Sequence, residues 1–198
     1  MMTGFVKETE GIFRLCVPFE RIYTSVFLLE SESGALLVDC ATTDGDVDRV
    51  IVPALREIGY EFSDLSAIAL THRHGDHAGG LDRILSIAPR LKVITEVGAV
   101  DGNIAVYPMA GHTEDSVGIY DARTKTLISG DGLQGAGVDK YRCSLKNKQA
   151  YIETIDKIKR DDGIENILFS HAYEPWYADR MIGREAVIAC LDECLKYI

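Results

Sequence analysis

One stretch decides how the chain is interpreted: Thr71-His72-Arg73-His74-Gly75-Asp76-His77-Ala78-Gly79-Gly80. It places four side chains that bind metal ions in proteins within six positions, namely His72, His74, Asp76 and His77. A short apolar run at 67–70 comes before it and predicts a buried strand. Apolar residues at helical spacing follow it up to Pro89 and predict a helix. The four side chains therefore lie in a turn between the carboxyl end of a strand and a helix, where open α/β structures place their chemistry.

The rest of the chain alternates strand and helix patterns around this turn. Gly75, Gly79 and Gly80 give the turn the backbone freedom to aim several side chains at one point. Pro53 either kinks an early helix or starts a new segment there. The remaining strands are predicted at 11–17, 23–29, 35–38, 92–95, 104–109, 116–120, 126–128 and 164–169, and the helices at 44–58, 146–160 and 179–197.

Composition limits the class of protein. A length of 198 residues favours one domain or a tightly joined pair, and 46% apolar residues support a real core. The net charge of −10 disfavours binding to a phosphate backbone, so no nucleic acid is expected as a partner. Neither a run of transmembrane length nor an apolar signal stretch in residues 1–10 is seen. We expect a cytoplasmic protein with a small-molecule substrate and no membrane partner, and a homo-oligomer is left open.

The five cysteines are odd in number and scattered in spacing. Without a secretion signal, free thiols are expected. Cys190 and Cys194 are one helical turn apart, which would suit either packing or a share in a metal site. Packing is favoured, because no further ligands stand near them in the sequence.

Residues 72–77 resemble the His-x-His-x-Asp-His signature of the metallo-β-lactamase fold superfamily. Four other segments resemble family segments in the same order, at 37–39, 110–113, 129–131 and 170–171. The chain has five histidines, and each occupies a ligand position of the family pattern. Asp131 stands where the family's classical β-lactamases have another ligand set, so antibiotic hydrolysis is disfavoured. The resemblance is nearer to the glyoxalase II and lactonase types.

This resemblance implies an α/β fold in which a β-sandwich is flanked by helices in four αβ/βα layers, over a single catalytic domain of residues 1–198. It implies two divalent metal ions, for which zinc is expected before iron or manganese. The implied ligands are His72, His74 and His112 for one ion, Asp76, His77 and His171 for the other, and Asp131 for both.

The implied reaction is hydrolysis of a small ester, thioester or lactone by a metal-bound hydroxide. Asp76 is expected to be catalytic as well, by orienting the water and carrying its proton. Two other classes stay open. One is an iron oxidoreductase that oxidises persulfides, and the other is a metal-binding protein without catalysis.

Three further features have two interpretations each. Asp39 either accepts a hydrogen bond near the site or caps the turn before 41–43. The basic and aromatic cluster at 139–142 either holds a substrate carboxylate or is a solvated loop. The aromatic residues of 172–177 either wall the pocket or pack in the core.

Overall fold

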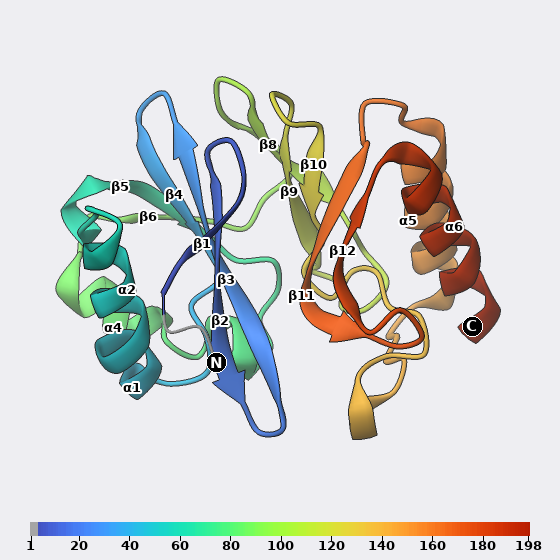
Figure 1. The fold of residues 1–198 in the computed structure, drawn as a ribbon, viewed down its shortest axis with the longest axis horizontal. Coiled ribbons are helices and arrows are strands. Elements are labelled where there is room, and N and C mark those ends of the chain that lie inside the picture. Colours follow the sequence, from blue (N-terminus) through green and yellow to red (C-terminus); the bar gives the residue numbers. More distant parts are fainter. Residues whose placement is uncertain (1–3) are drawn as a thin grey trace. The chain divides into compact units, whose positions relative to one another are not determined.

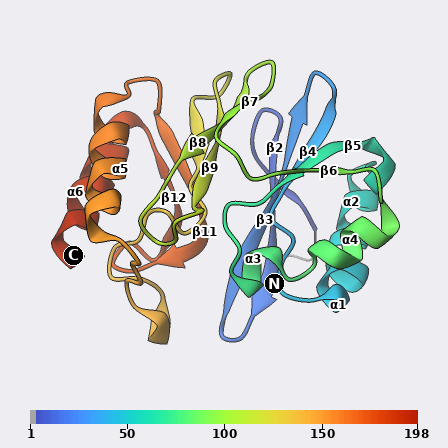
Figure 2. The same cartoon turned by 180° about the vertical axis from the view of Figure 1, so that it is seen from behind.

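The computed structural model describes residues 4–198, which divide into two compact units (Figures 1 and 2). The first unit ends at Thr95 and the second begins at Glu96. Each unit contains one six-stranded mixed sheet with helices beside it. The single catalytic domain expected from the sequence stays a prediction.

The sheet of the first unit follows the order of the chain. Its strands are β1 (Val6–Thr9), β2 (Ile12–Phe19), β3 (Ile22–Ser31), β4 (Gly34–Val38), β5 (Leu65–Ala69) and β6 (Lys92–Ile94). The first four strands pair antiparallel, and β4, β5 and β6 pair parallel. Its helices are α1 (Asp44–Asp46), the π-helix η1 (Val47–Ile51), α2 (Val52–Glu57), the 3-10 helix η2 (Phe62–Asp64), α3 (Gly75–Ala78) and α4 (Leu81–Ile87).

The core of this unit explains its layering. Parallel strands need crossover connections, and the helices between β4 and β6 supply them. Leu28, Leu37 and Ile68 of the sheet are fully buried in one cluster with Val47 and Ile51 of the helices. Pro53 lies in the first turn of α2, directly after the π-helical turn η1. Of the two predictions for Pro53, the structure agrees with the start of a new helical segment.

The second unit has the strand order β12-β11-β10-β9-β8-β7. Its strands are β7 (Gly98–Asp101), β8 (Ile104–Pro108), β9 (Val117–Asp121), β10 (Thr126–Ile128), β11 (Asn166–Tyr173) and β12 (Ala178–Ile182). Only the β10–β11 pair of this sheet is parallel among the described residues. The helices are η3 (Asp139–Tyr141), α5 (Lys148–Arg160), α6 (Arg184–Cys194) and η4 (Leu195–Tyr197), and α5 and α6 flank this sheet (Figure 1).

The structure corrects the prediction near the C-terminus. The helix expected at 179–197 is wrong at its start, because 178–182 forms β12 and pairs with β11. Gly183 then adopts a φ of 89°, which separates this edge strand from α6. The strand expected at 164–169 begins at Asn166 and runs through Tyr173, so His171 lies inside β11 and not after it. Pairing with a neighbouring strand has overridden local sequence preference here.

Two short strands were not predicted. Both β1 and β7 are four residues long and pair with one neighbour at the edge of their sheets. Their sequences, VKET and GAVD, are short and contain no aromatic residue, so they carry a weak strand signal. Among the described residues, no helix has the length and apolar character needed to cross a bilayer.

All five cysteines are free thiols, as expected. Cys190 and Cys194 are buried in α6, which agrees with a packing role. A hydrogen bond with Cys194, together with burial, raises the pKa of the Cys190 thiol. That thiol therefore stays protonated at neutral pH and is a poor metal ligand.

Candidate metal centre

The His72–His77 turn begins shortly after the end of β5 and runs into α3. His72 and His77 are buried, whereas His74 is partly exposed. The ring centroid of His72 lies 4.7 Å from that of His74 and 4.1 Å from that of His77. The turn therefore gathers three imidazole groups, as the sequence predicts.

The turn packs backbone against backbone on the segment after β4. The backbone N–H of Cys40 donates to the carbonyl of His77 at 2.7 Å. A Cβ atom added to Gly79 would lie 1.9 Å from the carbonyl oxygen of Thr42, and one added to Gly80 would lie 2.3 Å from that of Cys40. A Cβ on Gly75 would meet nothing within 4 Å. Glycine is thus required by close approach at positions 79 and 80 but not at 75.

Asp39 accepts three hydrogen bonds from residues of the histidine turn and its start. It is fully buried, and its Oδ1 accepts from the backbone N–H of Thr71 at 2.8 Å. Its Oδ2 accepts from the Thr71 hydroxyl at 2.8 Å and from Nδ1 of His77 at 2.8 Å. Helix α1 is capped by Thr43 instead. The structure therefore selects the first of the two interpretations of Asp39, a carboxylate that orients the histidine turn.

These hydrogen bonds assign the histidine tautomers. His77 donates from Nδ1 to Asp39, which leaves the lone pair on Nε2. Because the Thr71 hydroxyl gives its proton to Asp39, its oxygen acts as an acceptor, and Nδ1 of His72 at 3.2 Å is the donor. Both histidines thus present Nε2 as a metal-binding atom.

The second unit brings together the remaining three predicted ligands. His112 lies in the segment between β8 and β9, Asp131 lies after β10, and His171 lies in β11. Nε2 of His171 is 3.4 Å from Oδ1 of Asp131, and Nε2 of His112 is 3.7 Å from Oδ2. Each carboxylate oxygen therefore has one histidine nitrogen next to it.

Three further residues contact these ligands: Ser144 and Gln134, which had no predicted role, and Tyr173, one of the aromatic residues of 172–177. Nδ1 of His112 donates to the backbone carbonyl of Ser144 at 2.7 Å, which leaves the lone pair on Nε2. The Gln134 side chain accepts from the Ser144 backbone N–H at 2.9 Å and donates to the Asp131 carbonyl at 3.2 Å. The Tyr173 hydroxyl donates to Oδ1 of Asp131 at 2.6 Å. Because Ser144 acts through its main chain, the sequence held no signal for it.

The spacing of the donor atoms suits a metal ion. Two ligand atoms that each lie about 2.1 Å from a tetrahedral metal are about 3.4 Å apart. The three nitrogen–oxygen pairs match this spacing, with 3.4 Å for His77 and Asp76, 3.4 Å for His171 and Asp131, and 3.7 Å for His112 and Asp131. Imidazole and carboxylate donors suit zinc, manganese and iron. The donors within each unit therefore fit a divalent metal.

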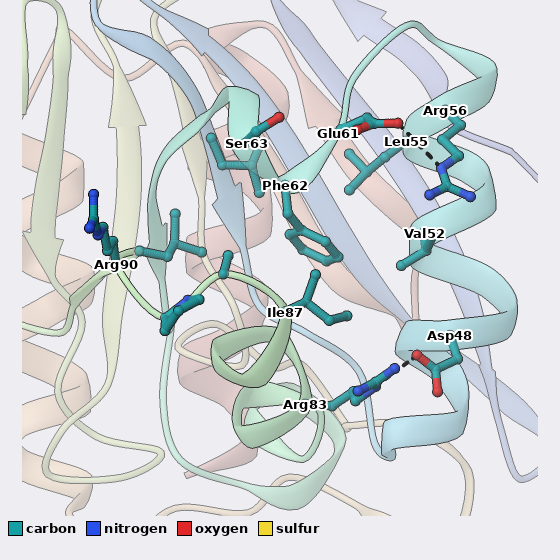
Figure 3. A pocket seen from close by; sticks show the side chains of 14 residues that line it. Asp48, Val52, Leu55, Arg56, Glu61, Phe62, Ser63, Arg83, Ile87 and Arg90 are labelled. Atoms are coloured by element: carbon teal, nitrogen blue, oxygen red, sulfur yellow. Dashed lines mark hydrogen bonds and ion pairs between the residues drawn. The ribbon is translucent and has the colours of Figure 1, made fainter.

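A separate cavity of about 730 Å³ lies in the first unit, away from the histidine turn (Figure 3). Its lining residues come from η1, α2, α4 and the segments 61–65 and 87–91, and they include the apolar side chains of Val52, Phe62 and Ile87. Two ion pairs lie at its rim, Arg83 with Asp48 at 2.8 Å and Arg56 with Glu61 at 3.7 Å. The cavity and the metal ligands of this unit are thus distinct features.

The sequence also singled out the cluster at 139–142 and the aromatic residues of 172–177. In the cluster at 139–142, Lys140, Tyr141 and Arg142 are exposed, and the Lys140 ammonium lies 5.2 Å from the Tyr141 ring centroid. A role in holding a substrate carboxylate stays a prediction. Of the aromatic residues that follow His171, Trp176 stacks on Phe169 at 5.5 Å, whereas Tyr173 contacts Asp131.

Comparison with known proteins identifies relatives. The family model of the metallo-beta-lactamase superfamily matches residues 20–90. A hydroxyacylglutathione hydrolase of Francisella tularensis subsp. holarctica is 27% identical over 154 residues, which is 69% of this chain and 58% of that protein. The uncharacterized protein YobT of Bacillus subtilis is 27% identical over 150 residues, which is 56% of this chain and 62% of that protein. The chain therefore spans less than two thirds of the length of these curated relatives.

Solved structures share the fold. A metallo-beta-lactamase from Erythrobacter litoralis has a TM-score of 0.71 at 18% identity and covers 97% of this chain and 96% of its own. The metallo-beta-lactamase FIM-1 from Pseudomonas aeruginosa has a TM-score of 0.73 at 16% identity and covers 97% and 94%. The predicted fold class is confirmed, with two six-stranded mixed sheets and flanking helices. The chain therefore resembles the metallo-beta-lactamase superfamily: the family model matches residues 20–90, and the shared fold agrees with the ligand pattern.

Proposed function

We propose that this protein is a metal-dependent hydrolase of small thioesters, esters or lactones. The observation that carries the proposal is the state of the donor groups. In each unit, buried histidines present Nε2 at metal-ligand spacing from a carboxylate, with hydrogen bonds on Nδ1 that select this tautomer. A thioester comes first because curated relatives are named hydroxyacylglutathione hydrolases. The β-lactamase neighbours support the fold and not the substrate.

We propose that the donors of both units hold two divalent ions, with zinc first. His72, His74 and His112 would bind one ion, Asp76, His77 and His171 the other, and Asp131 both. When bound, two such ions supply a Lewis acid for the substrate carbonyl and lower the pKa of water. Because this water is the nucleophile, the mechanism requires no serine or cysteine nucleophile.

The side chains of this protein do the positioning and the proton transfer. Asp39 keeps the proton of His77 on Nδ1 and so keeps Nε2 available as a donor. Asp76, whose side chain is 14% exposed, takes a proton from the attacking water as the new carbon–oxygen bond forms. The carbon–sulfur or carbon–oxygen bond of the substrate then breaks, and the same carboxyl group returns the proton to the leaving sulfur or oxygen.

Metal analysis combined with turnover tests this proposal. The protein is purified without added metal, its metal content is measured, and hydrolysis of an acylated glutathione is followed by the release of free thiol. We expect two zinc or manganese ions per chain and hydrolysis that a chelator abolishes. One iron per chain with oxygen uptake on a persulfide would instead establish the oxidoreductase. Bound metal with neither reaction, on thioester, ester and lactone alike, would contradict both enzyme functions.

A further inference from the structure

Tyr173 makes a contact with Asp131 that the proposed function does not use. It is the last residue of β11 and lies two positions after His171, so both side chains leave the strand on the same face. Its ring is 1% exposed, and its hydroxyl donates to Oδ1 of Asp131 at 2.6 Å. The rings of His171 and Tyr173 meet edge to face, with centroids 5.9 Å apart. One oxygen of Asp131 is therefore shared between a metal-ligand histidine and a phenol.

The position of the Tyr173 ring is independent of this hydrogen bond. Phe169 packs against Tyr173 edge to face, with ring centroids 5.5 Å apart. The next residue, Glu174, is held by two main-chain hydrogen bonds of 2.8 Å, to the carbonyl of Gly137 and from the N–H of Ala136. The end of β11 is thus joined to the segment that follows Asp131. Packing of the ring and these backbone hydrogen bonds place the Tyr173 hydroxyl next to the Asp131 carboxylate.

The two oxygens of Asp131 differ as a result. Oδ1 faces Tyr173 and His171, whereas Oδ2 faces His112. The terminal torsion of an aspartate is broad, so a carboxylate without a fixed partner can rotate and exchange its oxygens. A short hydrogen bond to a charged oxygen opposes that rotation.

We propose that Tyr173 is a positioning residue for a dinuclear metal centre, a centre that rests on the proposed function. Its hydroxyl holds the Asp131 carboxylate in the orientation in which Oδ1 faces His171 and Oδ2 faces His112, so that the carboxylate would be placed to bind metal. Loss of this hydroxyl would weaken the binding of one of the two proposed ions, because the Asp131 carboxylate would be free to rotate.

The test measures zinc binding to Tyr173→Phe, which keeps the ring and removes the hydroxyl. Both zinc dissociation constants of the metal-free protein are measured by competition with a chelator. We expect the second zinc ion to bind about 10–100-fold more weakly, the usual effect of losing a partner of a metal ligand. The matched control is Tyr120→Phe, which removes a hydroxyl that donates to the carbonyl of Gly163 at 2.9 Å in the same unit. Its constants should equal those of the wild type.

A double-mutant cycle separates positioning from general destabilisation. Tyr173→Phe is introduced into Asp131→Ala, and both zinc dissociation constants are compared across the four proteins. If Tyr173 acts through Asp131, its removal has no further effect in the Asp131→Ala background. An equal loss in both backgrounds, or unchanged zinc constants in Tyr173→Phe alone, would overturn the proposal.

Two further outcomes are informative. Should Tyr173→Phe not fold, 3-fluorotyrosine placed at position 173 alone keeps the packing and alters the hydroxyl as a donor. We expect it to shift the second zinc constant, and an unchanged constant would overturn the inference. A wild-type protein that binds two zinc ions and hydrolyses no thioester, ester or lactone contradicts the proposed function alone, since this test needs no substrate.

Discussion

The two units hold their proposed metal ligands in different ways. In the first unit, four ligands come from one turn, and a single buried carboxylate, Asp39, orients the turn. In the second unit, three ligands come from segments far apart in the sequence, and neutral groups orient them, namely the Ser144 carbonyl and the Tyr173 hydroxyl. The first arrangement depends on one charge, whereas the second depends on the register of a whole sheet. Substitutions should therefore damage the two units in different ways.

The largest effect is expected within the first unit, from Asp76→Asn. The amide keeps the shape and one oxygen donor but cannot carry a proton, so turnover should fall by about 10²–10⁴-fold. Initial rates of thioester hydrolysis are measured together with metal content, because lost metal would mimic lost catalysis. Asp82→Asn, on the neighbouring helix α4, is the control. If Asp76→Asn keeps both ions and near-normal turnover, Asp76 is only a ligand.

The next effect tests the dependence on one charge. Asp39→Ala removes the acceptor of three hydrogen bonds and leaves the donors of Thr71 and His77 buried. Each buried donor left without an acceptor costs about 1–3 kcal/mol, so the free energy of unfolding should fall by several such amounts. Urea denaturation of the metal-free protein measures it.

Asp46→Ala is the matched control for Asp39→Ala. Asp46 accepts hydrogen bonds from the N–H and hydroxyl of Thr43, but at an exposed helix end. Loss of such a cap costs about 1 kcal/mol. An equal fall in the free energy of unfolding for the two variants would show that the first unit does not depend on Asp39 more than on an ordinary helix cap.

A smaller effect is expected from the close packing of the turn. Gly79→Ala forces a methyl group against the carbonyl of Thr42 and should lower the free energy of unfolding by about 1–3 kcal/mol. Gly75→Ala places its methyl group in open space and should be neutral or slightly stabilising. Thermal unfolding of both variants gives the difference. A similar midpoint for the two would show that the turn can move away from the β4 segment.

The smallest effect tests the neutral support of the second unit. Gln134→Ala removes hydrogen bonds to the Ser144 N–H and the Asp131 carbonyl, neither of which involves a charged group. The net cost of such bonds is about 1 kcal/mol each, so this variant should unfold more easily than the wild type but less easily than Asp39→Ala. Urea denaturation of both variants under one condition tests the order. A reversed order would mean that neutral partners matter more than the buried carboxylate.

How far the site could be predicted follows from the same contrast. The turn at 72–77 was predicted because its ligands are close in sequence and each has a recognisable side chain. The role of Asp39 was left open, because a strand-end aspartate caps turns as readily as it supports a histidine. Ser144 was missed because it acts through its carbonyl, which leaves no trace in the residue type. Tyr173 was noted only as one aromatic among several, since its partner lies 42 residues away.

The same reasoning applies to the fold. Continuous apolar runs predicted β4 and β5, and β-branched, aromatic and aliphatic residues predicted β3. The edge strand β12 was predicted as a helix because its conformation depends on pairing with β11. Short segments that depend on a neighbour for their hydrogen bonds carry a weak local signal.

The position of these partners along the chain has a consequence for biosynthesis. Both groups that orient His72 and His77 through Nδ1, Asp39 and Thr71, precede them in the sequence. When the ribosome has synthesised the turn, Asp39 and Thr71 have therefore already been synthesised. Asp131, in contrast, must wait while the 42 residues up to Tyr173 are translated. During synthesis the hydrogen-bond partners of the His72–His77 turn are therefore complete before the partner of Asp131 is made.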